Sequence, residues 1–168
     1  MITSSELLAF AYHPVAYEQR LVNIIIPDGR QVLLLSPSEL ASHPLNPTNA
    51  PVTIKIEGME RYSNQLWEQA QELAFRYGHD GPITCHAFIS PVNGATFGIH
   101  TDPDNVIIYC VEGTKTMEIG GDLYRLQPGE YVHIPYDTPH RAINEHSSVM
   151  LSFGLERYYN DKMSSEGR

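Results

Sequence analysis

The sequence is short of cysteine, of positive charge and of long apolar runs, and each shortage excludes a class of protein. Its 168 residues include 2 cysteines, Cys85 and Cys110, which are too few for a disulfide-rich secreted domain. There are 11 Lys and Arg against 20 Asp and Glu, which gives a net charge of −9. That charge argues against a nucleic-acid backbone as the main partner. No apolar stretch approaches the length of a membrane-spanning helix.

These shortages predict a cytoplasmic protein with reduced thiols that binds neither nucleic acid nor a membrane. Residues 1–6 carry no basic segment of the kind that opens a secretory signal, in keeping with that location. A chain of 168 residues, 42% of them hydrophobic, suits one globular domain. We therefore expect a single domain over 1–168, in which 1–82 flank a barrel core at 83–155 and 156–168 form a tail.

The first half of the chain predicts short helices and strands. Thr3 and Glu6 have the spacing of a capping box at the start of a helix. Residues 21–26 and 31–35 are apolar and β-branched and are joined by a Pro-Asp-Gly turn, which predicts a β-hairpin. Its edge strand makes a homodimer possible. The other elements expected in this half are a helical turn at 36–41, a loop at 43–51, a strand at 52–57 and a helix at 63–77.

From residue 83 onward the pattern is that of a β-barrel or sandwich. Short apolar segments alternate with turns rich in Gly, Pro and Asp. The fold class predicted is therefore mainly β, a double-stranded β-helix (jelly-roll barrel) with a few flanking N-terminal helices. The strands are expected at 83–89, 96–102, 106–112, 115–119, 123–126, 131–134, 141–144 and 149–153.

A candidate metal site lies in this second half. His100 and Asp102 are two residues apart in a predicted strand, so their side chains are expected to share one face and bind one ion. His140 follows a later Pro-containing turn and supplies a third ligand. Two histidines and one carboxylate, with the other coordination positions open, form the ligand set of non-haem Fe(II) oxygenases. The alternative is a pair of structural histidines and a capping aspartate.

Two stretches of the second half resemble the motifs of the cupin superfamily. The residues with matching spacing are Gly94 and His100 for the first motif and Gly129, Pro135, His140 and Asn144 for the second. Asp102 departs from the common cupins, which have a second His and a Glu there. His-x-Asp, then Gly-x-Lys at 113–115 and a final His after a Pro-rich turn, resembles the Jumonji C-like (cupin-like) branch of Fe(II)/2-oxoglutarate dioxygenases.

The resemblance implies that His100, Asp102 and His140 hold Fe(II) and that 2-oxoglutarate and O2 are cosubstrates. The implied activity is hydroxylation of a small-molecule, amino-acid or peptide substrate with release of succinate and CO2. Lys115 occupies the position of the lysine that binds the distal carboxylate of 2-oxoglutarate. A buried ammonium needs an anionic partner, which supports that role. The alternative for Lys115 is a solvated side chain at a hairpin end.

Three further residues are candidates for cosubstrate binding. Asn105 follows the metal pair, where the family often places an amide, and Thr96 lies near the position of a related hydroxyl. Ser152 resembles a polar position on the last strand. Each has an ordinary role in a strand or turn as its alternative. His86, Tyr109 and His133 could line a pocket, but we expect them to be packed residues.

Two other functions remain open at this point. One is a metal-dependent cupin of another class, namely a cosubstrate-independent dioxygenase, an isomerase or a decarboxylase. In that case Lys115 would be exposed or would bind the substrate. The other is a non-enzymatic, ligand-binding cupin with a vestigial metal site. Lys115 favours the 2-oxoglutarate reading over the first alternative, and the complete triad disfavours the second.

Overall fold

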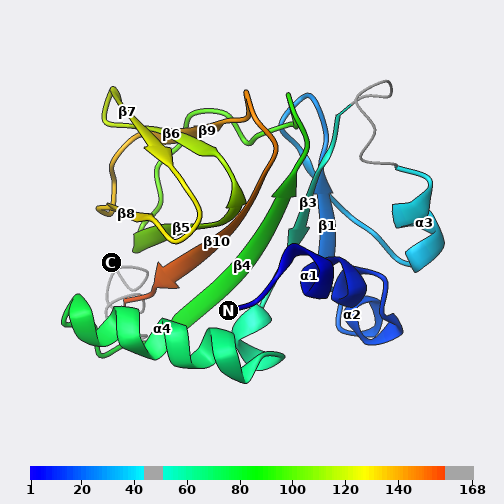
Figure 1. The fold of residues 1–168 in the computed structure, drawn as a ribbon, viewed down its shortest axis with the longest axis horizontal. Coiled ribbons are helices and arrows are strands. Elements are labelled where there is room, and N and C mark those ends of the chain that lie inside the picture. Colours follow the sequence, from blue (N-terminus) through cyan, green and yellow to red (C-terminus); the bar gives the residue numbers. More distant parts are fainter. Residues whose placement is uncertain (44–50, 158–168) are drawn as a thin grey trace, which may run out of the picture.

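The computed structural model describes residues 1–43 and 51–157 (Figure 1). Most of the loop expected at 43–51 and of the tail expected at 156–168 therefore lies outside the described residues. The helices are α1 (Ser4–Ala11), α2 (Pro14–Glu18), α3 (Pro37–Ala41), the 3₁₀ segment η1 (Met59–Arg61) and α4 (Asn64–Arg76). No helix in this part of the chain is long and apolar enough to cross a membrane.

Side-chain caps fix where the helices begin. The Thr3 hydroxyl accepts the backbone N–H of Glu6, and the Glu6 carboxylate accepts the backbone N–H of Thr3, which confirms the predicted capping box. Ser63 caps α4 by accepting the N–H of Leu66. These polar residues satisfy backbone donors that the first turn of a helix leaves without partners.

The strands form two antiparallel sheets. The larger sheet has the order β2-β1-β3-β4-β10-β5-β8 and the smaller one has the order β7-β6-β9. The strands are β1 (Val22–Ile25), β2 (Gln31–Leu33), β3 (Thr53–Ile56), β4 (Ile83–Ser90), β5 (Asn105–Gly113), β6 (Lys115–Ile119), β7 (Asp122–Leu126), β8 (Tyr131–Ile134), β9 (His140–Ile143) and β10 (Ser148–Leu155). In Figure 1 the smaller sheet and β5 with β8 curl into a barrel, and β1 and β3 extend its wall. The predicted fold class is confirmed.

Alternate residues of the central strands enter two different cores. On β10, Leu151 and Phe153 face the outer core, where the large sheet packs against α1, α2 and α4. Met150 faces the barrel interior, together with Ile108 of β5 and Met117 of β6. Successive side chains on a strand point to opposite faces, so one strand serves both cores. The inward row of each strand is therefore the row that can build a site inside the barrel.

The strand predicted at 96–102 is wrong. Residues 91–104 form an irregular segment whose only ladder contact is an isolated bridge between His100 and His140. Gly98 has φ +77°, a backbone conformation that breaks an extended strand and favours glycine. The apolar and β-branched residues of this segment resemble a strand, but Gly98 before the metal pair and Pro103 after it favour a loop.

Thr116 offers a test of the packing around β6. Thr116 is 3% exposed, and its hydroxyl has no hydrogen-bond partner among the described residues. A buried hydroxyl without a partner costs about 1–3 kcal/mol of stability. Thr116→Val is therefore expected to raise the free energy of unfolding by about 1 kcal/mol, measured by urea denaturation. A lower free energy of unfolding would show that the hydroxyl is hydrogen-bonded.

Candidate metal centre

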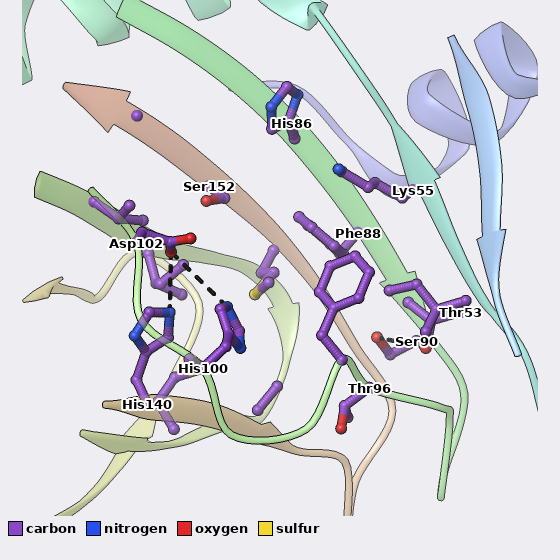
Figure 2. A pocket seen from close by; sticks show the side chains of 18 of the residues that line it. Thr53, Lys55, His86, Phe88, Ser90, Thr96, His100, Asp102, His140 and Ser152 are labelled. Carbon is purple, nitrogen blue, oxygen red and sulfur yellow. Dashed lines mark hydrogen bonds and ion pairs between the residues drawn. The ribbon is translucent and has the colours of Figure 1, made fainter. Parts of the chain in front are cut away.

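Two histidines and one aspartate meet at one mouth of the barrel. The candidate ligand atoms of His100, Asp102 and His140 all lie within 4.8 Å of one another. Asp102 Oδ2 is 3.2 Å from His140 Nε2 and 3.8 Å from His100 Nε2 (Figure 2). A single ion placed between these atoms can bind all three, since metal–ligand bonds to imidazole and carboxylate are about 2 Å long.

Backbone pairing across the two segments brings the ligands together. His100 N–H donates to His140 C=O at 3.0 Å, and His140 N–H donates to His100 C=O at 2.9 Å. The N–H of Asp137 donates to the C=O of Asp102 at 2.8 Å, which holds the turn before His140 against the loop. The ligands were predicted to converge because His100 and Asp102 share the face of a strand. That reason is wrong, because an isolated bridge in a loop positions them.

Each imidazole is oriented by a backbone carbonyl two residues earlier. His100 Nδ1 is 2.9 Å from the Gly98 oxygen, and His140 Nδ1 is 2.9 Å from the Thr138 oxygen. A carbonyl can only accept, so each Nδ1 carries a hydrogen, and in the neutral form of either ring the Nε2 atom has the lone pair that can bind a metal ion. Metal-binding histidines are held in the same way in other proteins, with the second nitrogen donating to a carbonyl or carboxylate.

The charges in the centre favour an anionic aspartate. The hydrogen bond from His140 lowers the pKa of Asp102, against the opposing effect of burial. Burial acts to lower the pKa of His140, but the hydrogen bond and charge of Asp102 and the Thr138 carbonyl outweigh it and raise that pKa. The space between these two side chains therefore favours positive charge, which a divalent ion held by the deprotonated ligands would supply.

The donor set fits a divalent transition metal with open coordination positions. His140 is buried, with a side chain 5% exposed, whereas the side chains of His100 and Asp102 are 35% and 38% exposed. All three residues line one cavity of the structure, so the remaining coordination positions of a bound ion could be reached from it. Two imidazoles and one carboxylate in this arrangement suit Fe(II) and related ions.

A cavity of about 290 Å³ continues from the metal centre into the barrel. The inward rows of β3, β4, β5 and β10 form its floor, and β6 and β9 form the opposite wall. Phe97, in the loop before the candidate metal ligands, also lines the cavity, and its ring centre lies 6.0 Å from that of His100. The metal centre and the barrel interior are therefore parts of the same cavity.

Lys115 points into this cavity and has no carboxylate partner among the described residues. The residue is 1% exposed, and its Nζ donates to Asn144 Oδ1 at 2.8 Å. Asn144 Nδ2 in turn donates to the Gly94 carbonyl at 2.9 Å, which fixes the amide. Burial lowers the pKa of Lys115 from 10.5 to about 8. An ammonium held this way, with only a neutral amide beside it, is ready to bind an anion.

Of the three other residues predicted to bind a cosubstrate, two line the cavity and one does not. Thr96 and Ser152 line the cavity, and the Thr96 hydroxyl accepts the N–H of Gly98 at 3.2 Å. Asn105 does not line it: its Oδ1 accepts the N–H of Tyr136 at 3.2 Å and lies 3.0 Å from His133 Nε2. The amide of Asn105 thus holds the first residue of β5 to His133 of β8 and to the turn that follows β8, and its contact with a cosubstrate stays a prediction.

Sequence reasoning missed several residues of the cavity. Asn144 was visible as a motif position but was given no role. His86 was expected to be a packed residue, yet it lines the cavity. The first half of the chain also contributes, because β3 pairs with β4 and extends the floor. The alternation of side chains along β3 and β4 indicates which residues of each strand share a face. Which of the two faces lines the barrel interior depends on the order of the strands in the sheet. The missed cavity residues are Thr53, Lys55, His86, Ser90 and Asn144.

Comparisons with known proteins agree with this architecture. Residues 88–153 match the family model described as "Cupin domain". A comparison with curated proteins gives no match. Among solved structures, YcfD from Escherichia coli, described as a ribosomal oxygenase, is 17% identical with a TM-score of 0.68, and the match covers 98% of this chain and 46% of YcfD. A YcfD structure in complex with cobalt and 2-oxoglutarate gives the same values, and one with cobalt and succinic acid is 16% identical.

These matches define the class of fold. The barrel is a double-stranded β-helix, and residues 88–153, which match the cupin model, contain all three candidate metal ligands and Lys115. The chain spans less than half the length of YcfD, with 46% of that protein covered. At 17% identity the likeness shows a common fold and not a common substrate.

Proposed function

We propose that this protein is an Fe(II)- and 2-oxoglutarate-dependent oxygenase that hydroxylates a small-molecule, amino-acid or peptide substrate and releases succinate and CO2. One observation carries the proposal. The same cavity contains a set of two histidines and one carboxylate and a buried lysine that has no carboxylate partner within residues 1–43 and 51–157. A metal-only cupin has no need for the lysine, whereas a dicarboxylic cosubstrate needs both groups.

The charges of the cavity suit 2-oxoglutarate. Its distal carboxylate would pair with Lys115, whose burial is costly without an anion. Asn144 keeps the ammonium in one position through the 2.8 Å hydrogen bond and so sets the distance to the metal centre. When bound to the triad, Fe(II) supplies the oxidative chemistry that couples decarboxylation of 2-oxoglutarate to hydroxylation of a C–H bond. That YcfD has been crystallised with cobalt and 2-oxoglutarate supports the proposal.

The protein's own residues would perform three tasks in this reaction. Lys115 would orient the cosubstrate, Asp102 and the two histidines would fix the geometry of the ion, and Phe97 would exclude water from one side. The Nδ1–H of His100 and of His140 stays bound to a backbone carbonyl, so neither imidazole is available as a general acid. Proton transfer from these rings is therefore not part of the proposed reaction.

Slow turnover without a prime substrate tests the proposal. The purified protein is incubated with Fe(II), 2-oxoglutarate and ascorbate under air, and succinate is followed by NMR. We expect succinate to form at a rate that falls to background when Fe(II) is omitted or chelated. If the protein binds Fe(II) but forms no succinate and does not bind 2-oxoglutarate, the proposal is wrong. A cosubstrate-independent dioxygenase, isomerase, decarboxylase or ligand-binding cupin would then be the better assignment.

The affinity for 2-oxoglutarate is expected to fall as the pH rises through 8. Burial lowers the pKa of Lys115 to about 8, so the free protein loses the ammonium above that pH. Only the protonated form pairs with a carboxylate, so the affinity stays level below pH 8 and falls about tenfold per pH unit above it. Calorimetric titration of the Co(II)-loaded protein between pH 7 and 9.5 measures this. The Cys110 thiol acts electrostatically on Lys115, and burial raises the pKa of this thiol above its ordinary value.

A guanidinium at the same position provides the control. Arginine stays protonated over this range, so the Lys115→Arg variant is expected to bind 2-oxoglutarate with an affinity that does not change between pH 7 and 9.5. A pH profile that falls equally in both proteins would assign the titration to another group and would contradict the role of Lys115.

A further inference from the structure

A second group of hydrogen-bond donors lies on the cavity floor, apart from Lys115. Lys55 of β3, His86 of β4 and Ser152 of β10 all line the cavity. Ser152 and His86 are directly opposite each other in the β4–β10 register, and β3 flanks β4 on its other side. Figure 2 shows the ends of the Lys55 and His86 side chains near each other above the strands, on the far side of the cavity from His140.

Two residues that do not line the cavity, Glu57 and Gln31, accept hydrogen bonds from the Lys55 ammonium. Its side chain is 13% exposed, and its Nζ lies 3.1 Å from Glu57 Oε1 and 3.1 Å from Gln31 Oε1. An ammonium has three N–H donors, so these two contacts leave one donor for a ligand. The rings of Phe88 and Phe97 lie 5.9 and 5.5 Å from the same nitrogen and limit its access to water. The donor that remains therefore lies in an environment where a charged partner binds strongly.

His86 presents a donor and not an acceptor to the cavity. Its Nδ1 accepts the backbone N–H of Gly58 at 3.4 Å, so its hydrogen is on Nε2. Burial, and then the charge of Lys55, lower the pKa of His86 to about 4, so the ring is neutral at pH 7. The hydroxyl of Ser152, across the strand pair, can donate in the same direction.

We propose that the prime substrate carries a carboxylate and that Lys55, His86 and Ser152 bind it on the cavity floor. This inference rests on the proposed function and names the chemical class of its substrate. Three donors from neighbouring strands that line one cavity, one of them charged, suit the two oxygens of a carboxylate. The remainder of such a molecule would lie over Phe88 and Met150, which line the path toward Asp102. The substrate is then a carboxylic acid with an aliphatic C–H bond directed at the metal centre.

The two lysines are suited to different ligands. Lys115 is 1% exposed and has no carboxylate beside it among the described residues, so the anion of the cosubstrate would balance its charge. Lys55 already has Glu57 as a partner and does not depend on a ligand for charge balance. Its attraction for an anion is weaker, which suits a substrate that must leave as product. The cavity lining also includes two acidic residues, Asp104 and Glu156, which could attract an amine. Preferential binding of an amine would therefore contradict the proposed carboxylate site.

Ligand-observed NMR tests the proposal without turnover. The Zn(II)-substituted protein is saturated with 2-oxoglutarate and titrated with hexanoate, hexanamide or hexylamine. We expect hexanoate to bind and the two other probes to bind at least tenfold more weakly. Lys55→Gln should weaken hexanoate binding about tenfold or more, because it removes a charge-assisted hydrogen bond. Glu57→Gln is the matched control, and it should bind hexanoate as well as the wild type or better because Lys55 loses its competing anion.

The outcomes separate this inference from the proposed function. Binding of 2-oxoglutarate is measured in the same samples, and its absence would overturn both. If 2-oxoglutarate binds but hexylamine or hexanamide binds as well as hexanoate, or if Lys55→Gln leaves hexanoate binding unchanged, the carboxylate site is wrong and the oxygenase proposal stands. The double variant Lys55→Gln/Glu57→Gln leaves no unpaired charge and keeps the test valid should the single variant unfold. In the Fe(II) protein, hexanoate should also raise succinate formation.

Discussion

Asp102→Ala is expected to reduce succinate formation from 2-oxoglutarate to the level of the protein without metal. The substitution removes one of three metal ligands and the only anion among them. Loss of a group that merely orients a ligand costs about 10–100-fold in metal affinity, so loss of a ligand itself should cost more than about 100-fold. Metal affinity is measured by competition with a chromophoric chelator, and turnover is measured as succinate formed.

An acidic residue outside the cavity serves as the control for this variant. Asp122 begins β7 and is exposed, and it is not among the residues that line the cavity. Asp122→Ala is therefore expected to retain wild-type metal affinity and succinate formation. If Asp102→Ala binds Fe(II) as tightly as Asp122→Ala does, the triad is not the metal site and the proposed function loses its basis.

Lys115→Met is expected to weaken 2-oxoglutarate binding by at least about 100-fold while metal affinity stays unchanged. The variant leaves the distal carboxylate inside an apolar barrel without a cation, and an unpaired buried charge costs about 3–5 kcal/mol. Lys115 is not among the three ligands, so the metal centre should be unaffected. Calorimetric titration of the Co(II)-loaded variant with 2-oxoglutarate measures the first quantity, and chelator competition measures the second.

The neighbouring residue on β6 separates the loss of charge from a disturbance of the strand. Thr116 is buried like Lys115 but points to the opposite side of the strand, so Thr116→Val should leave 2-oxoglutarate affinity at the wild-type value. Equal affinities of Lys115→Met and the wild type would show that another group, with Lys55 as the first candidate, binds the distal carboxylate. A weakened metal affinity in Lys115→Met would show that the substitution alters the barrel itself.

Local signals in the sequence predicted most elements of the fold. The capping box at Thr3, the hairpin around residues 27–29 and seven of the eight strands expected after residue 83 appear in the structure within a few residues. These features depend on neighbouring residues, through caps, turns and alternation. The prediction of a strand at 96–102 was wrong. The apolar residues of this segment resemble those of an edge strand, but only His100 forms a β-bridge with another segment.

The part of the site that the sequence did not predict depends on contacts between distant segments. Lys55 faces the metal cavity only because β3 pairs with β4, and no local pattern indicates that pairing. Asn105 lies next to the metal segment in sequence, yet its amide binds His133 and Tyr136 instead of the cavity. The role of Asn144 beside Lys115 likewise depends on a contact across 29 residues. Motif spacing thus identified the three candidate metal ligands that lie close together, but not the residues that shape the rest of the cavity.

A crystal structure of the protein loaded with Co(II) and 2-oxoglutarate tests the central claim most directly. The account predicts one ion bound by His100 Nε2, Asp102 Oδ2 and His140 Nε2, with the keto-acid end of 2-oxoglutarate on the ion and its distal carboxylate within hydrogen-bonding distance of Lys115 Nζ. An ion bound elsewhere, or a distal carboxylate that pairs with Lys55 and leaves Lys115 beside Asn144 alone, would contradict it.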